Sequence, residues 1–105
     1  MMSAAPSLEK KIQDPFIFYQ KLGVDNAMID YTKMTILFSL QPQFENLFEK
    51  CKIIKAKFEE KYRDSVWKVI IYLKNSGSCA VDYKNVFISV EYDNYNFVIF
   101  NNYNY

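Results

Sequence analysis

The stretch from Phe44 to Tyr62 constrains the fold most, because its apolar residues recur at spacings of three and four. This spacing places them on one side of an α-helix, while the charged residues fall elsewhere. The apolar stripe consists of Phe44, Leu47, Phe48, Cys51, Ile54, Phe58 and Tyr62. Pro42 suits the first turn of such a helix, where its missing N–H would have had no partner. A helix of this kind buries its stripe, so the rest of the chain must supply a layer for it to cover.

That layer is predicted from alternating apolar residues that follow the helix. In 66–74, the residues Trp67, Val69, Ile71 and Leu73 point one way. Asn75-Ser76-Gly77 provides a turn in which the glycine can take a positive φ. A return strand would continue the inward face with Cys79, Val81 and Tyr83. Further strands are predicted at 86–92 and 95–100, joined by a turn at Asp93-Asn94. We therefore expect an α+β fold, with an antiparallel β-meander packed against one long helix.

Within residues 58–83, a charged helix leads to three short pieces, Val66-Trp67, Ser76-Gly77 and Asp82-Tyr83. They correspond to a strand that begins with tryptophan, a glycine turn and a strand containing Asp-Tyr. In this order the pieces resemble the C-terminal half of the YezG-like family of bacterial immunity proteins. They cover well under half of the chain and are architectural, not catalytic. The resemblance implies a small α+β protein that binds and masks a partner toxin.

The part of the chain before the long helix is predicted from its capping signals. Asp14-Pro15 is typical of a helix start and Gly23 of a helix end, which predicts a short N-terminal helix packed on the sheet. Two interpretations of 24–40 remain open. Asp25-Asn26 could cap a helix, but Tyr31 to Leu40 alternates like a strand, and we take the strand.

Length and composition indicate a single globular domain. The chain has 105 residues, of which 50% are hydrophobic and 18% aromatic, and its net charge is +1. We expect a flexible tail at 1–13, one domain at 14–101 and a C-terminal tail at 102–105. The sequence contains neither a signal-peptide stretch nor an apolar run long enough to span a bilayer. A cytoplasmic protein without membrane contact is therefore predicted.

The residues for most chemistries are missing. The chain has no histidine and only two glycines, which argues against a nucleophile–base pair, an imidazole metal ligand and a phosphate loop. Glu59 and Glu60 are adjacent on the predicted helix, so their carboxylates should point apart. Cys51 and Cys79 are expected to be buried free thiols, with a disulfide between them as the alternative. We predict a protein that is not an enzyme and binds no metal or cofactor.

The aromatic content suggests a binding function. Tyrosine and phenylalanine exceed what one small core would absorb, and such rings suit protein interfaces. The predicted partner-binding residues are Tyr72, Tyr83, Phe87, Tyr95 and Phe97. A protein partner is expected, and a homodimer could form through the C-terminal strand.

A single-stranded nucleic-acid binder is the alternative function. Tyr72, Tyr83 and Phe87 would stack on bases while nearby lysines contact phosphates. The lysines in question are Lys68, Lys74 and Lys84. Acidic residues close in sequence match these lysines, so nucleic acid is not the expected partner.

Overall fold

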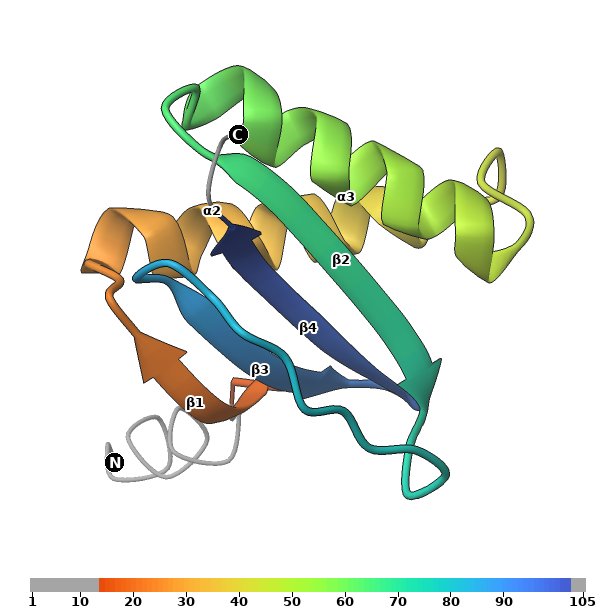
Figure 1. Ribbon diagram of the computed structural model, residues 1–105. Helices are drawn as coiled ribbons and strands as arrows, with labels where there is room; N and C mark the ends of the chain where they lie inside the picture. The colour runs from red at the N-terminus through yellow and green to blue at the C-terminus, as the bar shows by residue number, and fades with distance from the viewer. Residues whose placement is uncertain (1–13, 103–105) are drawn as a thin grey trace, which may run out of the picture.

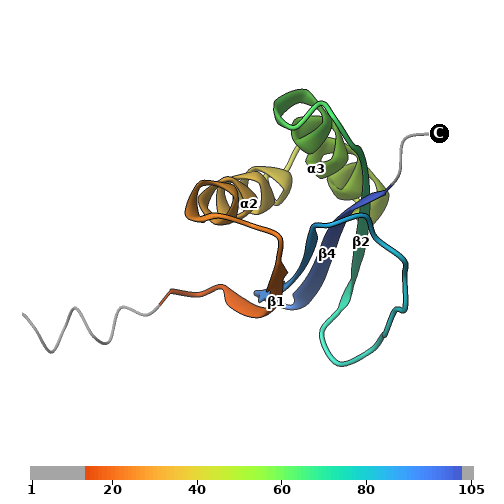
Figure 2. The same cartoon turned by 60° about the vertical axis from the view of Figure 1, so that its left-hand side comes forward.

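The computed structural model describes residues 14–102 and shows two helices covering one face of a four-stranded antiparallel sheet (Figure 1). In chain order the elements are β1 (Ile17–Leu22), α2 (Asn26–Ser39), α3 (Leu47–Lys61), β2 (Val66–Leu73), β3 (Phe87–Tyr92) and β4 (Tyr95–Asn102). Figure 2 shows the helices on one side of the sheet and the long β2–β3 connection on the other. The α+β class is as predicted, although a second helix joins the predicted long one.

The predicted N-terminal helix is wrong, because its residues form strand β1. The Asp14 side chain accepts a hydrogen bond from the backbone N–H of Phe16, at 3.0 Å, and so forms a turn where a helix cap was expected. The residues from Ile17 to Leu22 then pair with β3. Gly23 has φ +73° and ends a strand, not a helix. A run of aromatic and β-branched residues favoured the strand that forms.

The predicted strand at 31–40 is also wrong, and the helix alternative holds. Asp25 caps α2 by accepting from the Met28 N–H at 2.8 Å. The buried residues of α2 are Thr32, Thr35, Ile36 and Ser39. Since most of these are small and polar, the helix has only a weak apolar stripe, and the alternation of its other residues misled the prediction. The hydroxyl of Thr32 donates to the Met28 carbonyl, which satisfies one of the buried polar groups.

Helix α3 packs on the sheet as predicted but begins later. Its N-cap is Asn46, so Pro42 precedes the helix and does not lie in its first turn. Ile54 and Phe58 are fully buried, whereas Phe48, from the same predicted stripe, is 71% exposed. The ring of Phe58 lies 5.0 Å from that of Trp67, whose indole N–H donates to the Tyr62 carbonyl at 2.9 Å. These contacts join α3 to the first residues of β2.

The sheet contains the predicted strands β2, β3 and β4, but their order is not a meander. The order is β1-β3-β4-β2, so β4 lies in the middle and β2 at an edge. Val66 pairs with Asn102 at one end of β2, and Leu73 pairs with Tyr95 at the other. The tight turn between β3 and β4 is confirmed, with Asp93 at φ 59°.

The predicted return strand does not form. Residues 74–86, which we call the connection, form no strand and run along the sheet face away from the helices until Val86 joins the core (Figure 2). At this far end the Lys84 N–H donates to the Asn101 carbonyl of β4 at 2.8 Å, and the Asn101 N–H donates to the Val86 carbonyl at 3.2 Å. Asn75, not Gly77, takes the positive φ in the turn that begins it. Cys79 is exposed and Cys51 is half-buried, and both are free thiols, so the predicted burial of Cys79 is wrong.

The core lies between the helices and the sheet. Its buried members are Phe16, Ile36, Ile54, Phe58, Trp67, Val86, Ile88, Val90, Phe97 and Ile99. Strand β4 ends at Asn102, one residue into the predicted C-terminal tail. The rest of that tail and the predicted tail at 1–13 lie outside the described residues. Within 14–102, no helix combines the length and the hydrophobicity needed to cross a bilayer.

Candidate functional site

The five residues predicted to bind a partner lie on opposite faces of the sheet. Tyr72 and Phe87 line one small cavity on the face away from the helices, and the ring of Tyr83 lies 5.2 Å from that of Phe87. Phe97 is 0% exposed within the core, and Tyr95 is half-buried against that core. Phe97 therefore offers no surface to a partner, and only three of the five rings gather in one place.

The connection covers part of this aromatic group. A Cβ on Gly77 would lie 2.9 Å from the Tyr72 ring, so the backbone passes close against that side chain. The far end of the connection is held by Asn101, whose side-chain oxygen accepts from the backbone N–H groups of Asn85 and Val86, at 3.1 and 2.8 Å. The cavity that remains has a volume of about 310 Å³. Tyr72 and Phe87 are thus only half-exposed, because the chain itself lies against them.

The same face contains a charged group centred on Glu91. This carboxylate accepts from the Tyr19 hydroxyl at 2.6 Å and from the Lys74 ammonium at 3.0 Å. The hydrogen bond from Tyr19, followed by that from Lys74, lowers the pKa of Glu91. The same bonds raise the pKa of Tyr19 and the pKa of Lys74. Lys74, which the alternative function assigns to phosphate, is therefore already paired with a carboxylate.

The free edge of β2 presents a different kind of surface. Strands β3 and β4 each have neighbours on both sides, which leaves β1 and β2 at the edges of the described sheet. A homodimer through the C-terminal strand β4 is therefore not available, since both of its edges are occupied. Strand β1 has a register shift between Phe18 and Gln20, and such bulges blunt an edge. Strand β2 is longer and pairs without interruption, so it is the more regular edge.

The hydrogen-bond register shows which backbone groups point outward. The Lys74 N–H donates to the Asn94 carbonyl at 2.8 Å, and bonded pairs in an antiparallel ladder recur at every second residue. Ile70 and Tyr72 therefore bond to β4 through their backbones. The backbone N–H and C=O groups of the alternate residues point away from the sheet. The outward residues are Trp67, Val69, Ile71 and Leu73.

The position of Cys51 agrees with this assignment. Burial raises the pKa of the Cys51 thiol, and a hydrogen bond from the backbone N–H of Ile71 to the sulfur opposes this effect in part. Ile71 can reach a side chain of α3 only if its N–H points away from β4. The sulfur is a weak hydrogen-bond acceptor.

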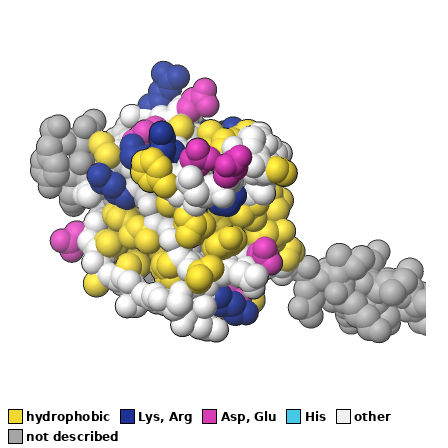
Figure 3. Space-filling model, turned by 90° about the vertical axis from the view of Figure 1, so that its right-hand side faces the viewer, with side chains coloured by type: hydrophobic (Ala, Val, Ile, Leu, Met, Phe, Trp, Pro, Cys, Tyr) yellow, Lys and Arg dark blue, Asp and Glu magenta, His cyan; other side chains and the backbone are white. Residues whose placement is uncertain are grey.

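A groove of about 410 Å³ runs along the β2 edge beside α3. Its lining residues are Phe48, Cys51, Lys52, Lys55, Lys68, Val69, Ile70 and Phe100. Phe48 projects from α3 on one side of the edge, while Ile70 and Phe100 belong to the opposite face of the sheet. Figure 3, which views the molecule from the side of the β2 edge, shows a broad band of apolar side chains with charged groups around it. The edge is thus bordered by apolar surface on both sides.

Sequence reasoning missed this groove, although two signals pointed to it. Ile70 interrupts the polar face of β2, and Phe48 belongs to a stripe that was assigned wholly to the core. The first places an apolar side chain on the otherwise polar face of β2, between Lys68 and Tyr72. Asn101 was missed as well, since it is the last residue of the predicted domain and was given no structural role.

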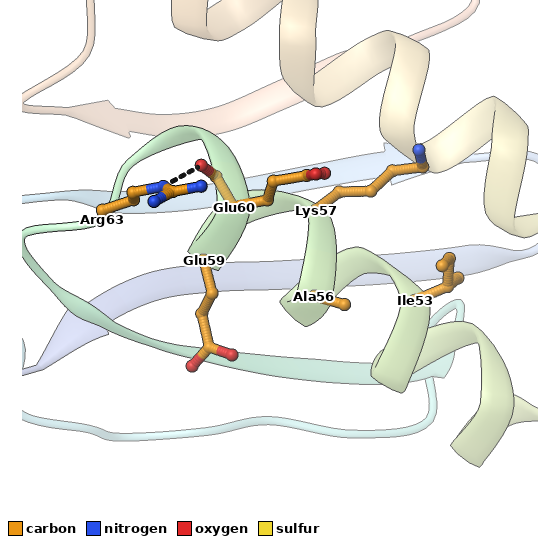
Figure 4. A pocket seen from close by; sticks show the side chains of 6 residues that line it. All are labelled: Ile53, Ala56, Lys57, Glu59, Glu60 and Arg63. Atoms are coloured by element: carbon orange, nitrogen blue, oxygen red, sulfur yellow. Dashed lines mark hydrogen bonds between the residues drawn. The ribbon is translucent and has the colours of Figure 1, made fainter.

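A shallow hollow on the outer side of α3 has no arrangement suited to acid–base chemistry (Figure 4). Figure 4 shows the side chains of Glu59 and Glu60 pointing apart, as their adjacency on a helix predicts. Glu59 binds Lys55 at 2.5 Å, and the Arg63 side chain donates to the Glu60 backbone carbonyl at 3.1 Å. Across residues 14–102, no group of three His, Cys, Asp or Glu side chains is placed to hold a metal ion.

Comparisons with known proteins find relatives in structure only. No family model and no curated protein matches the chain, so the resemblance to the YezG-like family stays a prediction. Among solved structures, the dynein light chain-like domain of a Fasciola hepatica calcium-binding protein superposes with a TM-score of 0.71 at 10% identity. That match covers 89% of this chain and 97% of the other. The DLC-like domain of CsTAL3 gives a TM-score of 0.63 at 13% identity, over 84% of this chain and 93% of the other. The chain thus has the fold of the dynein light chain-like domains.

Proposed function

We propose that this protein is a small noncatalytic interaction module that binds an extended segment of another protein along the free edge of β2. The observation behind the proposal is the edge itself: four residues with outward backbone groups, bordered by apolar side chains on both faces of the sheet. A strand that adds to such an edge gains main-chain hydrogen bonds, and the flanking surfaces receive its side chains.

Strand β2 lacks the backbone features that usually blunt an edge strand, and of its outward N–H groups the one of Ile71 is bonded to the Cys51 sulfur. Proteins usually blunt an edge strand with proline, a bulge or a cover, because an open edge invites pairing with other chains. Strand β2 contains no proline and no bulge, whereas β1 is interrupted. Phe48 is 71% exposed beside the edge and Leu73 is 53% exposed within it. A bound segment would remove this apolar surface from water.

The nucleic-acid alternative has less support. Base stacking needs open rings, and Tyr72 and Phe87 are half-buried beside the connection. Phosphate binding needs unpaired cations, and Lys74 is bonded to Glu91. A toxin, which the resemblance to the YezG-like family implies as the partner, would be one protein able to supply an extended segment.

Two proline substitutions in β2 test the proposal. Val69→Pro removes an N–H that points outward, so the sheet should persist while the edge can no longer pair. Ile70→Pro removes an N–H that bonds to β4, and should destabilise the domain by about 3 kcal/mol or more. Circular dichroism and urea unfolding would establish that the Val69→Pro variant is folded before any binding is compared.

Binding is measured by selecting peptides from a random display library on the wild-type domain and on the Val69→Pro domain. We expect peptides that are enriched on the wild type alone and that slow hydrogen exchange at the Val69 and Ile71 amides. Enrichment of the same peptides on both domains would contradict the proposal. So would protection of amides outside β2, or a selection that yields no binder.

A further inference from the structure

The charge around the β2 groove has one sign. Lys52 and Lys55 border it from α3 and Lys68 from β2, and no acidic residue is among its lining side chains. Lys55 is paired with Glu59 at 2.5 Å. Within residues 14–102, neither Lys52 nor Lys68 forms an ion pair. The Lys52 ammonium lies 5.3 Å from the centre of the Phe48 ring, at the border of the apolar surface.

These lysines flank the edge from both sides. Side chains alternate across a strand, so a segment added to β2 would direct half of its side chains toward α3 and half toward the opposite face. Those directed toward α3 would meet Phe48 and Lys52. Those on the other side would meet Ile70 and Lys68. On each side of the β2 edge, an added segment would therefore meet an apolar side chain and a lysine.

We infer that the segment bound at the β2 edge is rich in apolar and acidic residues, with aspartate or glutamate meeting Lys52 and Lys68. This inference rests on the proposed function and adds the chemistry of the partner to it. Carboxylates opposite these lysines would favour encounter and discriminate against basic segments, which would place like charges together.

A second copy of this chain matches the groove less well. Strand β2 contains Lys68 and no acidic residue, and β1 contains Lys21 and no acidic residue. Pairing of two β2 edges would place the groove lysines of both copies along one seam, with no carboxylate from either β2 to oppose them. The edges of this sheet are thus suited to a different chain, one that carries negative charge.

Blocked eight-residue peptides provide the probe. The sequence Val-Val-Glu-Glu-Val-Val-Glu-Glu places valine and glutamate alternately on both faces of a strand. Matched peptides carry glutamine or lysine in place of glutamate. Affinities are measured by titration calorimetry at low and at high salt, on the wild-type domain, Val69→Pro, Lys52→Gln/Lys68→Gln and the control Lys21→Gln/Lys84→Gln. The control removes the same charge from lysines that do not line the groove.

We expect the glutamate peptide to bind about tenfold more tightly than the glutamine peptide, because each ion pair of a glutamate with Lys52 or Lys68 contributes about 0.2–1 kcal/mol. The lysine peptide should bind least, because it places like charges together. The advantage should shrink at high salt and in the Lys52→Gln/Lys68→Gln variant, but not in the control. Val69→Pro should abolish binding of all peptides.

Equal binding of the glutamate and glutamine peptides, still abolished by Val69→Pro, would overturn the inference and leave the proposed function standing. Binding that survives Val69→Pro, or no binding by any peptide, would overturn both. Self-association in sedimentation experiments that Val69→Pro abolishes would identify a second copy as the occupant and contradict the acidic partner.

Discussion

Replacing Asn101 by leucine should strongly destabilise the domain, because this side chain holds the end of the connection to the sheet. Asn101 is 3% exposed in the described structure. Its oxygen accepts from the backbone N–H groups of Asn85 and Val86, and its amide nitrogen donates to Ser65 at 3.1 Å and to Asn85 at 2.6 Å. Leucine has a similar size but makes none of these bonds.

The size of the destabilisation follows from the hydrogen-bonding groups that would lose their partner. The Val86 N–H is in a buried bond, and leaving such a donor without a partner costs about 1–3 kcal/mol. The other bonds are partly exposed, so water can replace them and each contributes about 0.5–1 kcal/mol. For the one buried and three partly exposed bonds, the sum is about 2.5–6 kcal/mol. This is a large part of the roughly 5–15 kcal/mol that stabilises a domain.

Urea unfolding followed by the fluorescence of Trp67 measures these losses, since that indole is 1% exposed and reports on the core. Hydrogen exchange at the Val86 amide shows whether the connection opens first. A Leu variant that loses less than about 1 kcal/mol would refute the reasoning.

Three further predictions concern the fold. Gly23→Ala should destabilise by more than about 2 kcal/mol in urea unfolding, because φ is +73° and the new Cβ would lie 1.9 Å from the Asn85 carbonyl oxygen. Phe58→Ala should cost about 3–5 kcal/mol, whereas Phe48→Ala, from the same helix, should change stability by less than about 0.5 kcal/mol. The hydrogen bonds of Glu91 lower its pKa, so they stabilise the fold at pH values above the usual glutamate pKa. This stabilisation is lost as the pH falls through the lowered pKa. Urea midpoints of the wild type should therefore decline more steeply than those of Glu91→Gln below about pH 4.3; parallel declines would contradict this.

The elements predicted correctly are those in which local pattern and tertiary environment agree. Strands β2, β3 and β4 alternate clearly, and α3 has a stripe that includes the buried Ile54 and Phe58. Strand β1 and α2 were assigned wrongly because tertiary contacts decided between two acceptable local patterns. The residues after Asp14 pair with β3, a contact distant in sequence, and α2 covers the core with small polar side chains such as Thr35.

Aromatic content proved a poor guide to the site, because the rings are largely absorbed by contacts with one another. Phe58, Trp67, Tyr31 and Tyr62 form one cluster around the junction of α3 and β2. Other rings pair across the sheet, as Phe16 does with Tyr92 at 4.5 Å. A small core thus accommodates more aromatic residues than we expected from the number of tyrosine and phenylalanine residues. A high aromatic content does not by itself indicate a binding surface.

The candidate site depends instead on which strand lies beside β2, and local pattern does not determine that. The expected return strand would have paired with β2 and closed its edge. Residues 75–85 do not form that strand, since Ser76-Gly77-Ser78 at the start and Asp82 and Asn85 further on have low strand propensity. Strand β2 pairs with β4 alone and keeps its outward backbone groups free of any strand in the described chain. The open edge that we propose as the binding site therefore exists because β4 pairs with one side of β2 and no described segment pairs with the other.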